Sequence, residues 1–434
     1  MAGAAGVNDV EDAIVRAHRD EWARLVASTA RRFGSLDIAE EASSEAFATA
    51  VERWRAEGIP PNPAGWLSTT ATRRAIDLIR RENKRDSKHR EAMMIVDDEP
   101  HRSVGVIDDD RLRLIFICCH PALAMESRVA LTLRMVGGLT VAEIARALLV
   151  QESAVARRIT RAKTKIRQAG IPFRVPTAKD LPERLSGVLA VLFLIFNEGY
   201  LATGADTPAM RDDLTAEAIR LVRLVRTLLP ADGEVAGLLA MMLLIEARRP
   251  ARVSSSGELI TIDEQDRAAW SRTLIAEGHS LVRERLAAGT APGRYQILAA
   301  INAVHTSARD ARDTDWRQVL ALYDQLASLD PSPVVALNRA IAVAEVDGPH
   351  AALAIVDGLE GTLSEYHAFH ATRADLLRRL GRATDARESY DRAIRLCGNA
   401  AETRYLLCRR DESAVRPPAS EPIRSTRPHE EASP

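Results

Sequence analysis

The chain has 434 residues, 46% of them apolar, and a formal net charge of −1 at pH 7. This length and apolar fraction predict two or three globular domains with packed cores, and the charge balance excludes a protein that binds polyanions over its whole surface. The four cysteines have neither disulfide-framework nor zinc-finger spacing, and no membrane span or export signal is evident, so we expect a cytoplasmic protein.

The first 83 residues are predicted to form a helical domain. Apolar residues recur three and four positions apart here and along most of the chain, which predicts an all-α fold with almost no sheet. Helices are expected at 10–33 and 36–54, and a third at 66–81 follows the three prolines of the segment 57–65.

Two of these helices carry opposite charges. The helix at 36–54 has four carboxylates at helical spacing, an unsuitable surface for a phosphate backbone and a suitable one for a basic protein partner: Asp37, Glu40, Glu41 and Glu45. The helix at 66–81 begins at an exposed-looking tryptophan and is rich in arginine. That combination is typical of single-stranded DNA binding, although a plain amphipathic helix explains it equally well.

A polar, weakly periodic stretch at 84–108 predicts a flexible linker, and a second helical domain follows at 109–170. In it, Thr140 and Glu143 form a capping box that starts a short helix, and Ser153 is expected to cap the next helix. The second helix has a single apolar stripe at steps of four, three and four: Val155, Ile159, Ala162 and Ile166.

This pair of helices predicts a helix-turn-helix whose second helix enters a DNA major groove. Ser153 and Ala154 are small enough for close approach to DNA. Arg157 and Arg158 can reach guanine edges or phosphates, and Arg161 and Lys165 are placed to grip the backbone. The alternative is a solvated basic face on an ordinary helical hairpin, but capping, turn length and charge together favour DNA binding.

Residues 177–410 are predicted to be a helical extension, and the Pro- and Ser-rich segment 411–434 a disordered tail. Three aspartates, Asp324, Asp357 and Asp391, recur at steps of 33 and 34. Such a period in a helical sequence is typical of tetratricopeptide repeats, which stack into an α-solenoid.

Two other features of the chain have competing explanations. Charges that alternate in sign, such as Glu217 and Arg220, suit a ligand or partner site, but ion pairs between helices explain them as simply and are favoured because nothing identifies a ligand. The cysteines Cys118 and Cys119, flanked by apolar residues, favour small core side chains over a metal or redox site.

Three segments together resemble the extracytoplasmic-function sigma factors, members of the sigma-70 family that keep only regions 2 and 4. "LDIAEEASSEAFATAVERW" resembles region 2.2, "NPAGWLSTTATRRAIDLIRR" resembles regions 2.3 and 2.4, and "LTVAEIARALLVQESAVARRITRAKTKI" is similar to region 4.2. The resemblance covers about 10–170. It implies a dissociable subunit of bacterial RNA polymerase that selects promoters.

The resemblance also assigns roles to residues. It implies that Asp37, Glu40, Glu41 and Glu45 bind core RNA polymerase, and that the −35 element is read by Ser153, Ala154, Arg157, Arg158, Arg161 and Lys165. It places near the −10 element Asn62, Trp66, Arg73, Arg74, Asp77, Arg80 and Arg81. Arg73 stands where Asn is common, and Ser43 and Ser44 stand where an aliphatic residue and Gln are usual.

The extension resembles that of one subgroup, in which it continues into tetratricopeptide-like repeats and is thought to control the sigma factor. We therefore expect an alternative sigma factor whose partners are core polymerase and promoter DNA, with a possible intramolecular contact between extension and sigma domains. The alternative is a stand-alone helix-turn-helix regulator with a ligand- or peptide-sensing solenoid. Enzyme motifs are absent from the sequence, and no cofactor, metal or membrane partner is expected.

Overall fold

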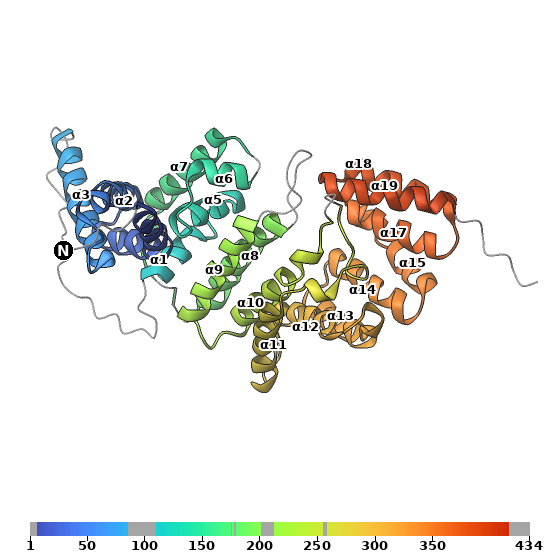
Figure 1. Ribbon diagram of the computed structural model, residues 1–434. Coiled ribbons are helices and arrows are strands. Elements are labelled where there is room, and N and C mark those ends of the chain that lie inside the picture. The colour runs from blue at the N-terminus through green and yellow to red at the C-terminus, as the bar shows by residue number, and fades with distance from the viewer. Residues whose placement is uncertain are drawn as a thin grey trace, which may run out of the picture. The chain divides into compact units, whose positions relative to one another are not determined.

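The computed structural model describes residues 7–85, 110–148, 150–174, 176–177, 179–200, 212–254 and 258–415. Within these ranges the regular structure is helical apart from one isolated bridge between Val253 and Leu259, which confirms the all-α prediction. The chain divides into two compact units, 1–249 with 270–303, and 250–269 with 304–434. Figure 1 labels the helices of both.

Three helices begin the first unit, close to the predicted bounds: α1 (Val7–Phe33), α2 (Leu36–Glu57) and α3 (Pro63–Arg85). Gly34, at φ 69°, ends α1 in a conformation that favours glycine. Ser35 then starts α2, because its hydroxyl accepts a hydrogen bond from the Ile38 amide at 3.3 Å. The predicted linker at 84–108 lies outside the described residues from position 86 on.

The second predicted domain contains four helices: α4 (Asp110–Cys118), α5 (Met125–Met135), α6 (Val141–Ala147) and α7 (Glu152–Gln168). Helices α5 and α7 pack against each other, and α6 packs on α7 (Figure 1). As predicted for core residues, Cys118 and Cys119 are buried. Burial raises the pKa of both thiols, that of Cys119 to about 11, which keeps them protonated and unreactive.

Five more helices complete the first unit: α8 (Leu181–Tyr200), α9 (Asp212–Leu228), α10 (Gly233–Glu246), α11 (Arg272–Ala287) and α12 (Arg294–Ser307). Helix α10 is buried nearly all round, and α8 and α9 pack on it. A single apolar core contains side chains of α1 to α10. The first part of the extension therefore shares its core with both preceding domains.

The second unit consists of a short lead-in with two 3-10 turns, at Arg249–Ala251 and Arg267–Ala269, and of paired helices. These helices are α13 (Trp316–Leu329), α14 (Pro333–Val346), α15 (Pro349–Asp357), α16 (Glu360–Leu363), α17 (His367–Arg379), α18 (Ala383–Leu396) and α19 (Ala400–Val415). A further 3-10 turn, Ala311–Asp313, precedes α13.

The 34-residue period of the sequence appears in this unit as a repeated ion pair. Asp324 of α13 pairs with Arg339 of α14 at 2.6 Å, and Asp357 of α15 pairs with Arg373 of α17 at 2.8 Å. The third aspartate, Asp391 of α18, pairs with α19 at 3.0 Å. Helix α19 continues to Val415, past the predicted end of the extension, and the rest of the predicted tail, 416–434, lies outside the described residues.

Candidate nucleic-acid interface

The predicted helix-turn-helix is present as α6 and α7. The Thr140 hydroxyl accepts a hydrogen bond from the Glu143 amide at 3.2 Å, and the Glu143 carboxylate accepts one from the Thr140 amide at 2.7 Å. This reciprocal pair is the predicted capping box. All four residues of the predicted apolar stripe of α7 are buried, from Val155 to Ile166, so the opposite side of the helix must face outward.

The outer face of α7 presents the residues predicted to read duplex DNA. Ser153, Arg157, Arg161 and Lys165 are exposed, and Arg158 is half-buried. The side chain of Arg161 also donates to the Arg157 carbonyl oxygen at 3.3 Å. This face is cationic, faces away from the core and lies on a helix whose seat is fixed by the buried stripe, as groove insertion requires.

One local prediction for α7 is wrong. Ser153 does not cap the helix, because α7 begins at Glu152 and its N-cap is Gln151, which makes no side-chain capping bond. Ser153 is the second residue of the first turn, beside the half-buried Ala154. The extended backbone of Gln151 (φ −69°, ψ 144°) starts the helix two residues earlier than the preference for serine suggested.

The candidate −10 residues of α3 have different surroundings. Asn62 caps α3, accepting a hydrogen bond from the Gly65 amide at 3.0 Å. Trp66 is half-buried rather than exposed, with its ring 5.7 Å from that of Trp54. Arg74 reaches back to α2 and pairs with Glu45 at 3.5 Å.

The remaining candidate residues of α3 lie outward. Arg73, Asp77, Arg80 and Arg81 are exposed, and Asp77 lies 3.9 Å from Arg80 within the same helix. An exposed pair at this distance contributes little to stability. The guanidinium groups of Arg73 and Arg81 have no ion-pair partner among the residues that the structure describes.

The acidic helix α2 faces α7 through a cluster of ion pairs that the sequence did not predict. Lys163 pairs with Asp37 at 2.9 Å and also with Glu40, and Glu40 pairs with Arg134 of α5. Arg167 lies 3.4 Å from Asp37. We call these five residues the α2–α7 ion-pair cluster. Its centre is largely shielded from water, since the side chains of Lys163, Glu40 and Arg134 are 11%, 15% and 16% exposed.

The four predicted polymerase-binding carboxylates therefore differ in accessibility. Asp37 and Glu40 belong to the α2–α7 ion-pair cluster, and Glu45 pairs with Arg74. Glu41 is exposed and makes no ion pair with any described residue. One signal of the cluster was present in the sequence: Lys163 stands four residues after Ile159 and three before Ile166, at the edge of the buried stripe.

Comparisons with known proteins identify both halves of this interface. The model of Sigma-70 region 2 matches residues 19–85, that of Sigma-70, region 4, matches 113–166, and that of a family of unknown function (DUF6596) matches 184–286. An uncharacterized protein, R00370, of Rhizobium meliloti (strain 1021) is 43% identical over 393 residues, which cover 89% of this chain and 92% of that protein.

A second relative carries a functional name. The ECF RNA polymerase sigma factor SigK of Mycobacterium ulcerans (strain Agy99) is 28% identical over 178 residues, 37% of this chain and 92% of that protein. This chain belongs to the extracytoplasmic-function sigma factors. No solved structure is significantly similar to it. In this sigma factor α1–α3 are region 2, α4–α7 are region 4, and α8–α11 contain the family of unknown function.

The extension of the sigma factor makes hydrogen bonds with both regions through α9. Glu217 holds Arg220 at 2.8 Å, and the Glu217 side chain is only 13% exposed. Arg220 donates to the carbonyl oxygen of Arg19 on α1 and to that of Val136 after α5, both at 3.4 Å. Of the two explanations for these charges, the ion pair is the one that the contacts support.

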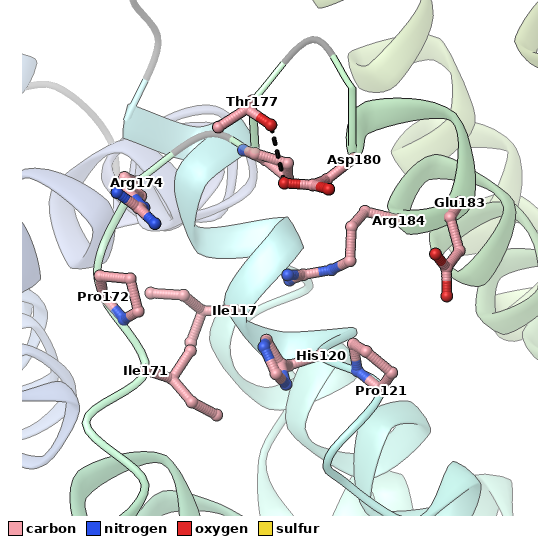
Figure 2. Close-up of a pocket in the computed structure, with 11 residues that line it drawn as sticks. Ile117, His120, Pro121, Ile171, Pro172, Arg174, Thr177, Asp180, Glu183 and Arg184 are labelled. Carbon is pink, nitrogen blue, oxygen red and sulfur yellow. Dashed lines mark hydrogen bonds between the residues drawn. The ribbon is translucent and has the colours of Figure 1, made fainter.

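A cavity of about 300 Å³ lies where region 4 meets α8, between Ile117, His120, Ile171 and Arg184 (Figure 2). Arg184 extends from α8 and donates to the Phe116 carbonyl oxygen at 2.7 Å. Burial and then the neighbouring Arg184 and Arg128 lower the pKa of His120, so this imidazole is neutral at pH 7. The polar groups of the cavity thus mainly join region 4 to the extension.

Two classes of site receive no support from the described part of the chain. It contains no group of three or more His, Cys, Asp or Glu side chains placed to hold a metal ion. No helix in it is long and apolar enough to cross a membrane. The site of interest is therefore the set of charged helix faces on regions 2 and 4.

Proposed function

We propose that this sigma factor binds core RNA polymerase through the acidic face of α2 and directs initiation at specific promoters. The observation that carries this proposal is the outward cationic face of α7, seated by a capped helix-turn-helix in the same compact unit as the acidic helix α2. A DNA-reading helix alone would suit any regulator. The acidic helix adds a surface for a basic protein partner, which a stand-alone regulator does not need.

Each charged face would have its own role. Arg157 and Arg158 of α7 would contact base edges or phosphates of the −35 element, and Arg161 and Lys165 would hold its backbone. On α3, the exposed Arg73, Arg80 and Arg81 would lie along the opened strand of the −10 element, with Trp66 at the start of the helix. Asp37, Glu40, Glu41 and Glu45 would face core polymerase.

We further propose that the extension modulates this activity through its contacts with the sigma regions. Its helices α8 and α9 share the apolar core of regions 2 and 4, and Arg220 donates hydrogen bonds to backbone oxygens on both sides. Deleting the extension would expose that core. Point changes in α9 are for this reason a cleaner probe of modulation than a truncation after Pro176.

Run-off transcription with core polymerase and the full-length chain tests the proposal. We expect the chain to bind core in the absence of DNA and to direct initiation at a cognate promoter. Replacing Arg220 by Gln, which removes the bonds to Arg19 and Val136, should change the level of transcription if the extension modulates it. Binding to duplex DNA without any binding to core would instead identify a stand-alone regulator.

A further inference from the structure

The carboxylates proposed to bind polymerase are already engaged within the chain. Asp37 and Glu40 of α2 are paired with Lys163, Arg134 and Arg167 of region 4. We infer that region 4 and core polymerase are alternative partners of the acidic face of α2, so that the free chain is closed and must open before polymerase can bind. This inference rests on the proposed function, because it concerns the same surface.

The shielding of the α2–α7 ion-pair cluster supports mutually exclusive binding. Glu40 is contacted from two sides, by Lys163 of α7 and by Arg134 of α5, and its side chain is 15% exposed. A second protein cannot reach this carboxylate while both cations remain in place. Exposed Glu41 is still available, which provides a first point of contact for polymerase before the chain opens.

The chemistry of the cluster makes the exchange reversible. Separating Lys163 from Glu40 leaves two charges that need either water or a new partner, because a desolvated charge without a partner is costly. Opening returns Lys163 to water, and a basic surface of polymerase would supply new cations to Glu40 and Asp37. An ion pair is thus replaced by an ion pair, and the free-energy difference between the two states stays small.

The extension is placed to hold the closed state. Arg220 of α9 bonds to the carbonyl oxygens of Arg19 in region 2 and Val136 in region 4, and Glu217 fixes its orientation. The indole N–H of Trp22 in region 2 also donates to the Met135 carbonyl oxygen of region 4, at 3.1 Å. Moving region 4 away from region 2 breaks these bonds together with the ion-pair cluster.

Replacing Lys163 by Gln separates the two states. The change removes the cation of α7 that contacts both Asp37 and Glu40 but leaves every proposed polymerase-binding carboxylate intact. Because the apparent affinity for polymerase scales with the fraction of open chain, we expect Lys163→Gln to bind core about three- to tenfold more tightly than the natural chain. The matched control is Lys179→Gln, the same substitution at an exposed lysine, which should leave the affinity unchanged.

The measurement is a titration of core polymerase, without DNA, into full-length chain that carries a fluorescent label on the exposed Cys408. If Lys163→Gln is poorly folded, as circular dichroism would reveal, Arg167→Gln replaces it. The Arg167 side chain is 69% exposed, and its loss should raise the affinity about twofold. Tighter binding by these variants supports the inference.

Two other results have distinct meanings. If the natural chain binds core and neither Lys163→Gln nor Arg167→Gln binds more tightly than Lys179→Gln, the inference of alternative partners is overturned while the proposed function stands. If neither the natural chain nor any of the variants binds core, the proposed function itself fails, and the inference fails with it.

Discussion

The two faces of α7 carry the same kind of charge and have opposite surroundings. Arg157, Arg161 and Lys165 face outward, whereas Lys163, between them in sequence, is 11% exposed and paired with Asp37 and Glu40 of region 2. A block of positive charge in a sequence is therefore not one surface. In this sigma factor one part is available to DNA, and the other part neutralises an acidic helix of the same chain.

The comparison also separates two kinds of energetic contribution. Cations on the outer face contribute little to folding, because water and salt screen them, and they act when a phosphate or base edge arrives. Cations on the inner face act before any partner binds, since they compensate carboxylates that region 4 covers. Substitutions on the two faces should therefore change different measurements.

The largest effect is expected at Glu40. In Glu40→Lys, a cation would lie against Lys163 and Arg134, and the carboxylate proposed to meet polymerase would be lost. We expect affinity for core to fall more than about tenfold, which corresponds to 1.4 kcal/mol. Adding Lys163→Glu to this variant should restore the ion pair and the thermal stability but leave binding to core weak. Recovery of core binding in the double variant would show that Glu40 matters only within the chain.

The outer face should affect promoter reading alone. Arg157→Ala is expected to reduce discrimination at the −35 element by about 1 to 3 kcal/mol if its guanidinium contacts a base edge. Run-off transcription from natural and altered −35 sequences measures the ratio. Lys163→Gln should leave this ratio unchanged. A uniform loss at all sequences with Arg157→Ala would assign the residue to phosphate, and a change of ratio with Lys163→Gln would contradict the division between the two faces.

A smaller effect is expected at Gly138, in the turn between α5 and α6. Its φ is +77°, and an added Cβ would lie 2.8 Å from a ring carbon of His18 and 3.0 Å from the Trp22 ring. Gly138→Ala should therefore lower the free energy of unfolding by about 1 to 3 kcal/mol. Gly170→Ala is the matched control, with φ +57° and no atom within 4 Å of the added carbon. Equal losses would mean that backbone strain alone, and not contact with region 2, explains the effect.

The smallest effect concerns the pH dependence of the same interface. Burial lowers the pKa of His18, Arg134 and Arg220 lower it further, and Glu143 partly opposes them. Below pH 6.5 the unfolded chain takes up a proton that the folded chain resists. Stability should consequently fall as the pH decreases from 6.5 to the lower folded-state pKa, and stay level above 6.5. Comparison of denaturant unfolding with His18→Gln isolates this contribution, and an identical slope in both chains would exclude it.

Much of the fold could be predicted because its signals are local. The capping box at Thr140, the buried stripe from Val155 to Ile166 and the recurrence of Asp324 at 34-residue steps all depend on residues close in sequence or on a period. Each of these predictions is confirmed by hydrogen bonds, burial or ion pairs. The resemblance to regions 2 and 4 is confirmed by the family models.

The features that could not be predicted depend on pairs distant in sequence. Lys163 and Glu40 are 123 residues apart, and Arg220 and Arg19 are 201 apart. Charge and spacing alone do not tell which of many cations meets which carboxylate. The same reason explains Trp66, whose partial burial depends on Trp54 of another helix. The roles of the exposed arginines of α3 and α7 in binding DNA remain predictions.

The distance between regions 2 and 4 in the free and polymerase-bound chain tests the central claim most directly. Spin labels at Ala48 of α2 and Thr160 of α7, two exposed positions outside the α2–α7 ion-pair cluster, would report it by pulsed dipolar spectroscopy, with Cys397 and Cys408 replaced by serine. We predict one narrow short distance in the free chain and a longer one after core polymerase is added. A distance that stays short and unchanged on saturation with core would contradict the account.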